Sequence, residues 1–205
     1  MSLVNVERLV VRRGGNTILG GVDLTVEAGE VLGVVGKNGC GKSTLLLAIA
    51  GVLAPTDGRV TIAGASVWGG SRERMRARRA LGYVPEGADP PGFLLGGELW
   101  AMCAAARGAA PPGSELVAAL GLDELRDVPL ERMSLGQRRR ACIAAALLGP
   151  PKLLVLDEPD NGLDARRAEA LADLMRAHAA AGNAAIIATH DRDLLSKIAA
   201  RMFTL

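Results

Sequence analysis

Residues 36–44 read GKNGCGKST, and residues 30–35, immediately before them, read EVLGVV. A short apolar run of this kind is typical of a strand that is buried on both faces. The segment KSTLLLAIAGVL, which begins at Lys42, has the pattern of a helix. The glycine-rich stretch therefore joins a buried strand to a helix, which is the position of a phosphate-binding loop.

The residue types in this loop fit the chemistry of phosphate binding. Gly36 and Gly41 are separated by four residues, and Lys42 and Ser43 follow them. Glycines let successive backbone N–H groups turn toward an anion, and the helix N-terminus adds partial positive charge. Lys42 can reach the outer phosphates, and the Ser43 hydroxyl can bind Mg²⁺. The residues predicted to contact the nucleotide are Gly36, Lys37, Asn38, Gly39, Cys40, Gly41, Lys42, Ser43 and Thr44.

A second apolar strand, in LLVLDEPD (153–160), ends in two acids. Asp157 at the strand end can hold Mg²⁺ through water, and Glu158 can orient or deprotonate an attacking water molecule. Considered alone, two acids after a strand are more often the start of a helix, where they compensate the helix dipole. Together with the glycine loop they favour phosphoryl chemistry.

The segment MSLGQRRR (133–140) is the third candidate. Its three arginines lie at the expected N-terminus of a helix, where the helix dipole disfavours cations. Helix stability alone therefore does not readily explain why arginines stand at these positions. A helix start that exposes Ser134, Gly136 and Gln137 can contact an anion. The alternative is an ordinary N-cap by Ser134 with arginines on the surface.

The wider pattern indicates an α/β fold. Strand-like segments at 3–11 and 22–26, separated by the turn glycines of RRGGNTILGG, predict an antiparallel sheet at the N-terminus. Buried strands expected at 152–157 and 184–190, with a helix at 165–181 between them, predict a parallel sheet covered by helices on both faces. We expect one domain over residues 1–205, in which 1–85 and 150–205 form the core and 86–149 form an inserted helical lobe.

Composition excludes several classes of protein. Hydrophobic residues make up 49% and charged residues 22%, with a net charge of +2, which is typical of folded globular proteins. No segment is expected to span a membrane. The three cysteines, Cys40, Cys103 and Cys142, have no metal-ligand spacing and are expected to be reduced thiols. The basic run SRERMRARRA (71–80) is more readily a solvated helix face than a nucleic-acid site, so no nucleic-acid partner is expected.

Taken in order, GKNGCGKST, GYVPE, MSLGQ, LLVLDEPDNGLD and ATH resemble the ATP-binding-cassette (ABC) ATPases, in particular the ATP-binding subunit of a bacterial transporter. The resemblance implies a phosphate-loop NTPase core that binds ATP and Mg²⁺ and hydrolyses ATP at a dimer interface. MSLGQ is similar to the signature motif, which contacts a nucleotide held by the other subunit. Asp164 resembles the D-loop acid and His190 the switch histidine. Glu86 occupies the place of the Q-loop glutamine, and the resemblance implies that it binds the metal ion together with Ser43 and Asp157.

The resemblance also implies partners and a location. A second ATP-binding subunit, identical or not, and a separate transmembrane permease subunit are expected, with the chain cytoplasmic and peripheral on the inner face of the membrane. The permease would approach Phe93, Leu94, Leu95 and Trp100, although core packing is the more natural role for Trp100. The rival functions are a soluble ABC-type ATPase that acts on DNA or ribosomes, and a nucleotide-gated interaction module.

Three positions depart from the common family pattern. Arg13 stands where an aromatic residue usually stacks on adenine; a guanidinium plane can also stack on a base. Leu135 replaces the first glycine of the signature motif, and Glu86 replaces glutamine. The last two replacements resemble members that serve exporters.

Overall fold

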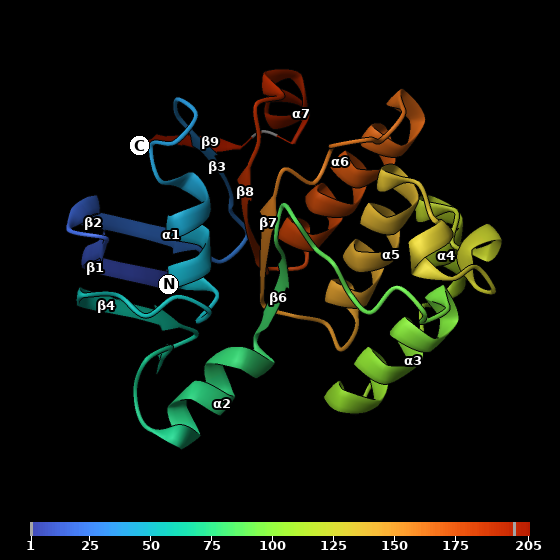
Figure 1. Cartoon of the computed structure of the whole chain (residues 1–205), viewed down its shortest axis with the longest axis horizontal. Helices are drawn as coiled ribbons and strands as arrows, with labels where there is room; N and C mark the ends of the chain where they lie inside the picture. The colour runs from blue at the N-terminus through green and yellow to red at the C-terminus, as the bar shows by residue number, and fades with distance from the viewer. Residues whose placement is uncertain (1, 199) are drawn as a thin grey trace.

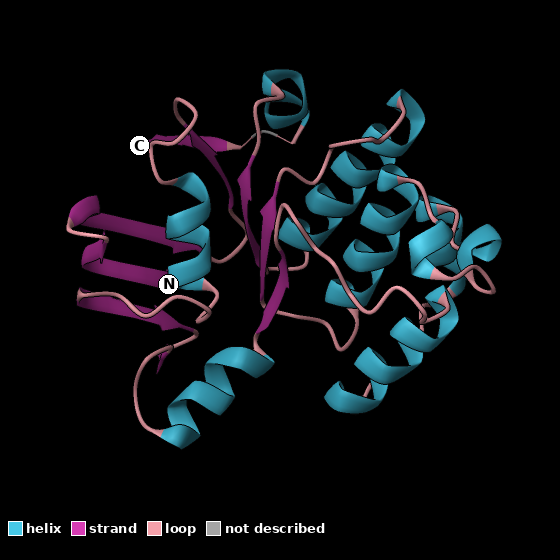
Figure 2. Ribbon diagram, viewed as in Figure 1, coloured by secondary structure: helices cyan, strands magenta, loops and turns pink. Residues whose placement is uncertain are grey.

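Two sheets carry the fold, and the phosphate-loop helix lies between them (Figures 1 and 2). The computed structural model describes residues 2–198 and 200–205. One sheet is antiparallel, in the order β2-β1-β4-β5, and is formed by β1 (Ser2–Arg13), β2 (Asn16–Glu27), β4 (Asp57–Ile62) and β5 (Ala65–Ser66). The other is parallel, in the order β6-β7-β8-β3-β9, and is formed by β3 (Val31–Val35), β6 (Leu81–Val84), β7 (Leu153–Asp157), β8 (Ala184–Ala188) and β9 (Arg201–Thr204).

The parallel sheet is covered on both faces, because every residue of β7 and β8 is buried. Successive side chains of a strand point to opposite faces. Leu154 and Leu156 accordingly join one apolar core, and Leu153 and Val155 join the other. The first core lies under α5 (Leu135–Leu147), α6 (Ala165–Ala180) and α7 (Arg192–Lys197), and the second packs around α1 (Lys42–Ile49). The predicted α/β fold with an antiparallel N-terminal sheet is confirmed.

The first hairpin is longer than predicted. The segment RRGGNTILGG was expected to be a connection, but β1 and β2 extend through most of it and pair from Ser2↔Glu27 to Arg13↔Asn16. Gly14 and Gly15, both with positive φ (53° and 81°), form the whole turn. Two residues with positive φ are what a tight hairpin turn requires, because its twist then matches that of the strands.

The segment between β6 and β7 contains α3 (Gly96–Arg107), α4 (Ser114–Leu120), two short 3₁₀ turns (Asp123–Leu125 and Leu130–Arg132) and α5. Trp100 is 2% exposed, and its indole N–H donates to the carbonyl oxygen of Ala141 at 3.0 Å, which fixes α3 against α5. The core role was therefore the right one for Trp100. Phe93 is 75% exposed. The proposed limits of this lobe, residues 86–149, stay a prediction.

The remaining helix, α2 (Ser71–Arg79), precedes the edge strand β6 (Figure 1). The C-terminal strand β9 was not predicted. It pairs with β3, and the backbone N–H of Leu205 donates to the carbonyl oxygen of Val35 at 3.0 Å. This contact places the segment that ends at Leu205 beside the start of the phosphate loop.

Candidate functional site

The loop between β3 and α1 has the backbone that its glycines allow. Gly39 (φ 78°) and Gly41 (φ 108°) are in the left-handed region, which other residues adopt at a cost. Lys42 is 8% exposed, and its Nζ donates to the carbonyl oxygens of Gly36 (3.1 Å) and Lys37 (3.3 Å). These bonds hold the ammonium group within the loop. In the part of the chain that the structure describes, no carboxylate forms an ion pair with it.

A pocket of about 410 Å³ adjoins this loop and collects residues from four separate parts of the sequence. They follow the carboxyl ends of β3, β6, β7 and β8, the edge at which parallel sheets bind ligands. The lining consists of Asn38, Gly39, Lys42, Ser43, Glu86, Glu158, Asp160, Asn161 and His190. Five of the predicted site residues outside or at the end of the loop are thus brought to one place: Lys42, Ser43, Glu86, Glu158 and His190.

Asp157 lies at the end of β7, 3% exposed, and is hydrogen bonded to Ser43. Burial raises the pKa of its carboxyl group, the carboxylate of Glu86 raises it further, and the Ser43 hydrogen bond opposes this. Mg²⁺ prefers oxygen ligands and is usually held by one or two protein groups together with phosphates. The Ser43 hydroxyl and the Asp157 carboxylate are such a pair. The described residues contain no cluster of three or more His, Cys, Asp or Glu that would form an all-protein metal cage.

Glu158 is held in place by its backbone and its side chain. It has φ 47°, a costly conformation for a residue with a side chain, and its N–H donates to the carbonyl oxygen of Ala188 at 2.7 Å. Its Oε1 lies 3.3 Å from Nε2 of His190, and its Oε2 accepts from the His190 N–H at 3.4 Å. Burial raises the pKa of Glu158, and the neighbouring His190 opposes the rise. A carboxylate with a raised pKa is a stronger general base once it is ionised.

The turn after Glu158 is tied to the end of β8 by a hydrogen bond that was not predicted. The hydroxyl of Thr189 donates to Oδ1 of Asp160 at 2.6 Å and accepts from the N–H of Asp191 at 3.0 Å. Thr189 is 2% exposed. Asp160 lies in the DEPD motif and Thr189 in the ATH motif. Their contact could not be predicted from these motifs, because it depends on the pairing of β7 with β8.

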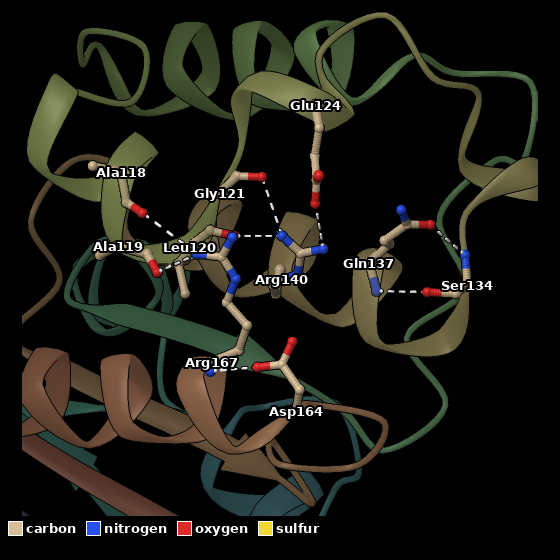
Figure 3. A network of polar contacts seen from close by, with 10 residues as sticks. All are labelled: Ala118, Ala119, Leu120, Gly121, Glu124, Ser134, Gln137, Arg140, Asp164 and Arg167. Atoms are coloured by element: carbon tan, nitrogen blue, oxygen red, sulfur yellow. Dashed lines mark hydrogen bonds and ion pairs between the residues drawn. The ribbon is translucent and has the colours of Figure 1, made fainter.

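The signature-like residues line a different pocket, of about 290 Å³, which shares no residue with the first. Ser134 caps α5: its Oγ accepts from the N–H of Gln137 at 3.2 Å, and the Gln137 side chain accepts from the N–H of Ser134 at 2.8 Å (Figure 3). The capping alternative was therefore correct for Ser134. The pocket is lined by Ser134, Gly136, Gln137, Arg140, Gly162, Leu163, Asp164 and Arg167.

Gly136 and Asp164 are held by close contacts at this second pocket. A Cβ atom at Gly136 would lie 2.0 Å from the carbonyl oxygen of Gly162, so only glycine fits there. Asp164 caps α6, and its Oδ1 accepts from the N–H of Arg167 at 2.8 Å. The start of α5 and the start of α6 thus form one surface.

The capping alternative placed the arginines of α5 on the surface, but two of the three are buried and only Arg138 is partly exposed. Arg139 and Arg140 are 4% and 7% exposed. Arg140 donates to the carbonyl oxygens of Leu120 (2.6 Å) and Gly121 (3.1 Å) and to Glu124 (2.8 Å), and Arg167 donates to Ala118 (3.4 Å) and Ala119 (3.0 Å) (Figure 3). These carbonyl groups lie in the last turn of α4 and at its C-cap, Gly121, where side chains often supply the hydrogen bonds that a further turn of helix would make. The C-terminal end of α4 attracts cations, and this attraction explains the position of Arg140, whereas Arg138 forms an ion pair with Asp89.

Arg139 joins α5 to the first pocket. It donates to the carbonyl oxygens of Pro85 (2.7 Å), Glu86 (2.5 Å) and Asp157 (3.4 Å). Its guanidinium group therefore fixes the backbone at the ends of both β6 and β7. The sequence shows the arginine beside the signature-like segment, but not these partners.

Arg13 lies apart from both sets. It is exposed at the turn of the β1–β2 hairpin, paired with Asn16, and lines neither pocket. A contact between Arg13 and a base stays a prediction.

A family model described as ABC transporter matches residues 19–161 of this sequence. The chain belongs to this family. It is 42% identical over 205 residues to a putative ABC transporter ATP-binding protein of Streptomyces avermitilis, a match that covers 98% of this chain and 36% of that protein. The ABC ATPase domain described here therefore spans about a third of the length of that relative.

Two other relatives of the ABC domain act in opposite directions according to their names. The cytochrome c biogenesis ATP-binding export protein CcmA of Gluconobacter oxydans is 37% identical over 188 residues (92% of this chain, 81% of that protein). The cobalt import ATP-binding protein CbiO of Rhodobacter capsulatus is 37% identical over 196 residues (92% and 70%). A solved ATP-binding subunit of an ABC transporter superposes with a TM-score of 0.91 at 26% identity and covers 99% of this chain and 85% of that one.

The predicted class, an ABC ATPase domain that binds ATP, is confirmed by these matches. No helix in residues 2–198 and 200–205 is long and apolar enough to span a membrane. The roles assigned to single residues, and the use of Mg²⁺, stay predictions.

Cys40 provides a chemical test of the phosphate loop in the ABC domain. Its Sγ lies 2.6 Å from where a Cβ at Gly36 would be, so a group attached to the sulfur has to displace the loop. We expect maleimide to modify Cys40 and to block ATP binding, and Mg²⁺·ATP to protect the thiol. Peptide mapping after labelling with and without nucleotide measures this.

The other two thiols are internal controls for this experiment. Burial raises the pKa of Cys103, and raises that of Cys142 to about 11, so little thiolate is present and both should label slowly in either condition. Equal labelling of Cys40 with and without nucleotide would show that the loop is not the nucleotide site.

Proposed function

We propose that this chain hydrolyses Mg²⁺·ATP at the interface of a cassette dimer and drives transport, in the export direction, through a separate membrane subunit. The observation that carries the proposal is Glu158, a carboxylate fixed beside Lys42 and Ser43 in one pocket while the signature-like residues line another. A site built from one pocket of each subunit would use both.

Each residue has a distinct task in the proposed reaction. The backbone of the loop and Lys42 bind the phosphates, and Ser43 and Asp157 are the groups that would hold Mg²⁺, which supplies charge neutralisation on the transferred phosphoryl group. Glu158 orients the water and accepts its proton at a carboxylate oxygen. His190, 3.3 Å from that carboxylate, holds its orientation and faces the same pocket. Ser134, Gly136 and Gln137 would contact the nucleotide of the partner subunit.

A groove of about 390 Å³ supports the presence of a membrane partner. It lies between the end of β6 and helices α3 and α5, and most of its lining is apolar, including Val84, Pro85, Ala88, Leu99 and Cys103. Its lining includes Pro85 and Ala88, which lie on either side of Glu86 in the sequence. A helix of the permease seated there would touch the segment that carries a residue of the nucleotide pocket.

The direction of transport is proposed from two residues and one relative. Leu135 and Glu86 are replacements that resemble exporter subunits, and the match to the export protein CcmA covers 81% of that protein. The match to the import protein CbiO covers 70% of its length. Sealed vesicles that contain the chain with its membrane subunit, with ATP on the side of the chain, would show substrate leaving that side.

Site-specific photo-cross-linking in cells tests the membrane partner. A photoreactive residue at Phe93, or at Ala106 on the lining of the groove, is expected to capture an integral membrane protein. Met202 on β9, 59% exposed, is the matched control and should not capture it. Capture of ribosomal or DNA-bound proteins at Phe93 and Ala106, with no membrane protein, would overturn the proposal in favour of a soluble ABC ATPase.

A further inference from the structure

Helix α2 concentrates positive charge on one surface of the molecule. It carries five arginines and one glutamate, a net charge of +4, whereas the whole chain has +2. All five arginines (Arg72, Arg74, Arg76, Arg78 and Arg79) are exposed, and within the described residues none forms an ion pair. Neither proposed nucleotide pocket contains any of them. Unpaired charge at this density attracts anions from solution.

A pocket of about 480 Å³ lies between α2 and the C-terminal end of α3. Among the residues that the structure describes, three arginines, Arg78, Arg79 and Arg107, line it and no acidic residue does. The other lining residues are Met75, Ala106, Gly108 and Gly149. The positive charge of these three guanidinium groups is not balanced by a carboxylate in the lining, so the cavity favours an anion.

Arg107 gives this pocket a fixed wall. Its Nη2 donates to the carbonyl oxygen of Leu81 at 2.8 Å, while its Nη1 is buried without a hydrogen-bond partner among the described residues. Its side-chain stem packs on Gly149, where an added Cβ would lie 2.9 Å from the Cβ of Arg107. The guanidinium is therefore anchored through a neutral carbonyl, and no carboxylate of residues 2–198 or 200–205 forms an ion pair with it.

The chemistry of the pocket favours a phosphate group. Guanidinium groups bind phosphate oxygens through paired N–H donors, and such pairs are stronger than neutral hydrogen bonds. A second cavity, of about 310 Å³, lies on another side of α2 and is lined by Arg76, Arg79 and Lys152, again with no acid. Because cationic groups lie on two sides of α2, the helix can bind a partner surface that carries several phosphate groups.

The exposed side chain of Met75 favours a lipid surface over an acidic protein as the partner of α2. It is 56% exposed and lines the same pocket as Arg78 and Arg79. At a membrane surface the cations of such a helix can contact anionic headgroups while an exposed apolar side chain among them enters the lipid. We propose that the α2 surface, through the pocket of Arg78, Arg79 and Arg107, binds the phosphate of an anionic lipid headgroup.

This lipid site goes beyond the proposed function, because it requires neither the permease nor ATP hydrolysis. It gives the ATP-binding chain a direct contact with the membrane surface. The groove for the permease and the lipid pocket share Ala106 and Arg107 in their linings, so the two proposed sites adjoin each other.

Vesicle co-sedimentation of the full chain tests the site. Vesicles that contain phosphatidylglycerol should bind the protein, vesicles of phosphatidylcholine alone should not, and added salt should weaken the binding. The variant Arg78→Gln/Arg79→Gln removes two charges from the pocket. The matched control, Arg72→Gln/Arg74→Gln, removes two charges from exposed positions of the same helix that do not line it.

Both variants lose two charges and the diffuse attraction that goes with them. We expect the pocket variant to bind vesicles about tenfold more weakly than the control variant, because it also loses charged hydrogen bonds to the phosphate. Equal losses in the two variants would show diffuse attraction and overturn the pocket, and equal binding to both kinds of vesicle would overturn the lipid site. Soluble glycerol phosphate tests whether a free phosphate ester is the ligand instead. If it displaces the protein from vesicles at a phosphate concentration equal to that of the lipid, the assignment to a lipid headgroup would be wrong.

Other macromolecules are tested in the same assay. Preferential binding to a polyglutamate peptide or to single-stranded DNA over the anionic vesicles would overturn the assignment to lipid. ATP hydrolysis, measured on each variant in solution, should be unchanged, so failure of the lipid site and failure of the proposed ATPase mechanism give different results.

Discussion

Replacement of Glu158 by glutamine is expected to slow ATP hydrolysis by about 10²-fold to 10⁴-fold while ATP still binds. Glutamine keeps the shape of the side chain but cannot accept a proton from water. The proposed phosphate contacts are those of the loop and Lys42, which the change leaves in place. Single-turnover phosphate release measures the rate, nucleotide titration measures the affinity, and size-exclusion chromatography in Mg²⁺·ATP should show a trapped dimer.

Asp160→Asn is the control for a loss of charge in the same pocket. Asp160 also lines the pocket, but its Oδ1 accepts from Thr189, and an asparagine oxygen can keep that bond. We expect a much smaller loss of rate in this variant. Turnover at the wild-type rate in Glu158→Gln would contradict the role of Glu158 as the base, whatever the control shows.

The second large effect concerns the signature-like segment and requires two inactive variants. Ser134→Arg places a bulky side chain in the pocket that is expected to complete the partner's site, so hydrolysis should be abolished. Nucleotide affinity of the isolated chain should be nearly unchanged, because the phosphate loop lies in the other pocket. Lys42→Ala removes the phosphate contact itself and should lose both affinity and hydrolysis.

Mixing the two variants distinguishes a site shared between subunits from a site within one subunit. In a mixed dimer of Ser134→Arg with Lys42→Ala, a shared arrangement puts both lesions in one composite site and leaves the other intact, so phosphate release should return. In a cis arrangement every site carries a lesion and no activity returns. Full hydrolysis by Ser134→Arg as a monomer would exclude the signature role.

The structure requires one more control, because Ser134 also caps α5. Loss of an N-cap costs about 1 kcal/mol of stability, so Ser134→Arg carries a structural defect as well as a steric one. Ser134→Ala loses the cap without the bulk. It should be destabilised to a similar extent, and comparison of the two separates the steric block from the weakened helix.

Features that depend on residues close together in the sequence were predicted correctly, and features that depend on distant residues were not. The phosphate loop, β7 and β8 were predictable because a glycine spacing and short apolar runs are local patterns, and local geometry decides them. The capping of α5 by Ser134 was likewise readable, since its partner Gln137 lies three residues away. The length of the first hairpin was not, because the pairing of β1 with β2 depends on how the Gly14–Gly15 turn closes.

The contacts that complete the site are long-range and left no pattern in the sequence. Arg140 reaches carbonyl groups at residues 120 and 121, and Thr189 reaches Asp160. Every residue has a backbone carbonyl oxygen, so the sequence does not show which of them a guanidinium group will bind. The strand β9 was missed for a related reason: a short edge strand is stabilised by its neighbour, β3, more than by its own composition.

The position of Arg139 has a thermodynamic consequence for communication within the molecule. One buried side chain of α5 is bonded to the backbone of Pro85, Glu86 and Asp157, so a displacement of the helix strains the geometry around the nucleotide pocket. Coupling between two sites is reciprocal: the free energy by which ATP favours one position of α5 equals the free energy by which holding α5 in that position tightens ATP binding. If the proposed membrane partner holds this helix, it would therefore set the affinity for ATP to the same extent that ATP sets the affinity for the partner.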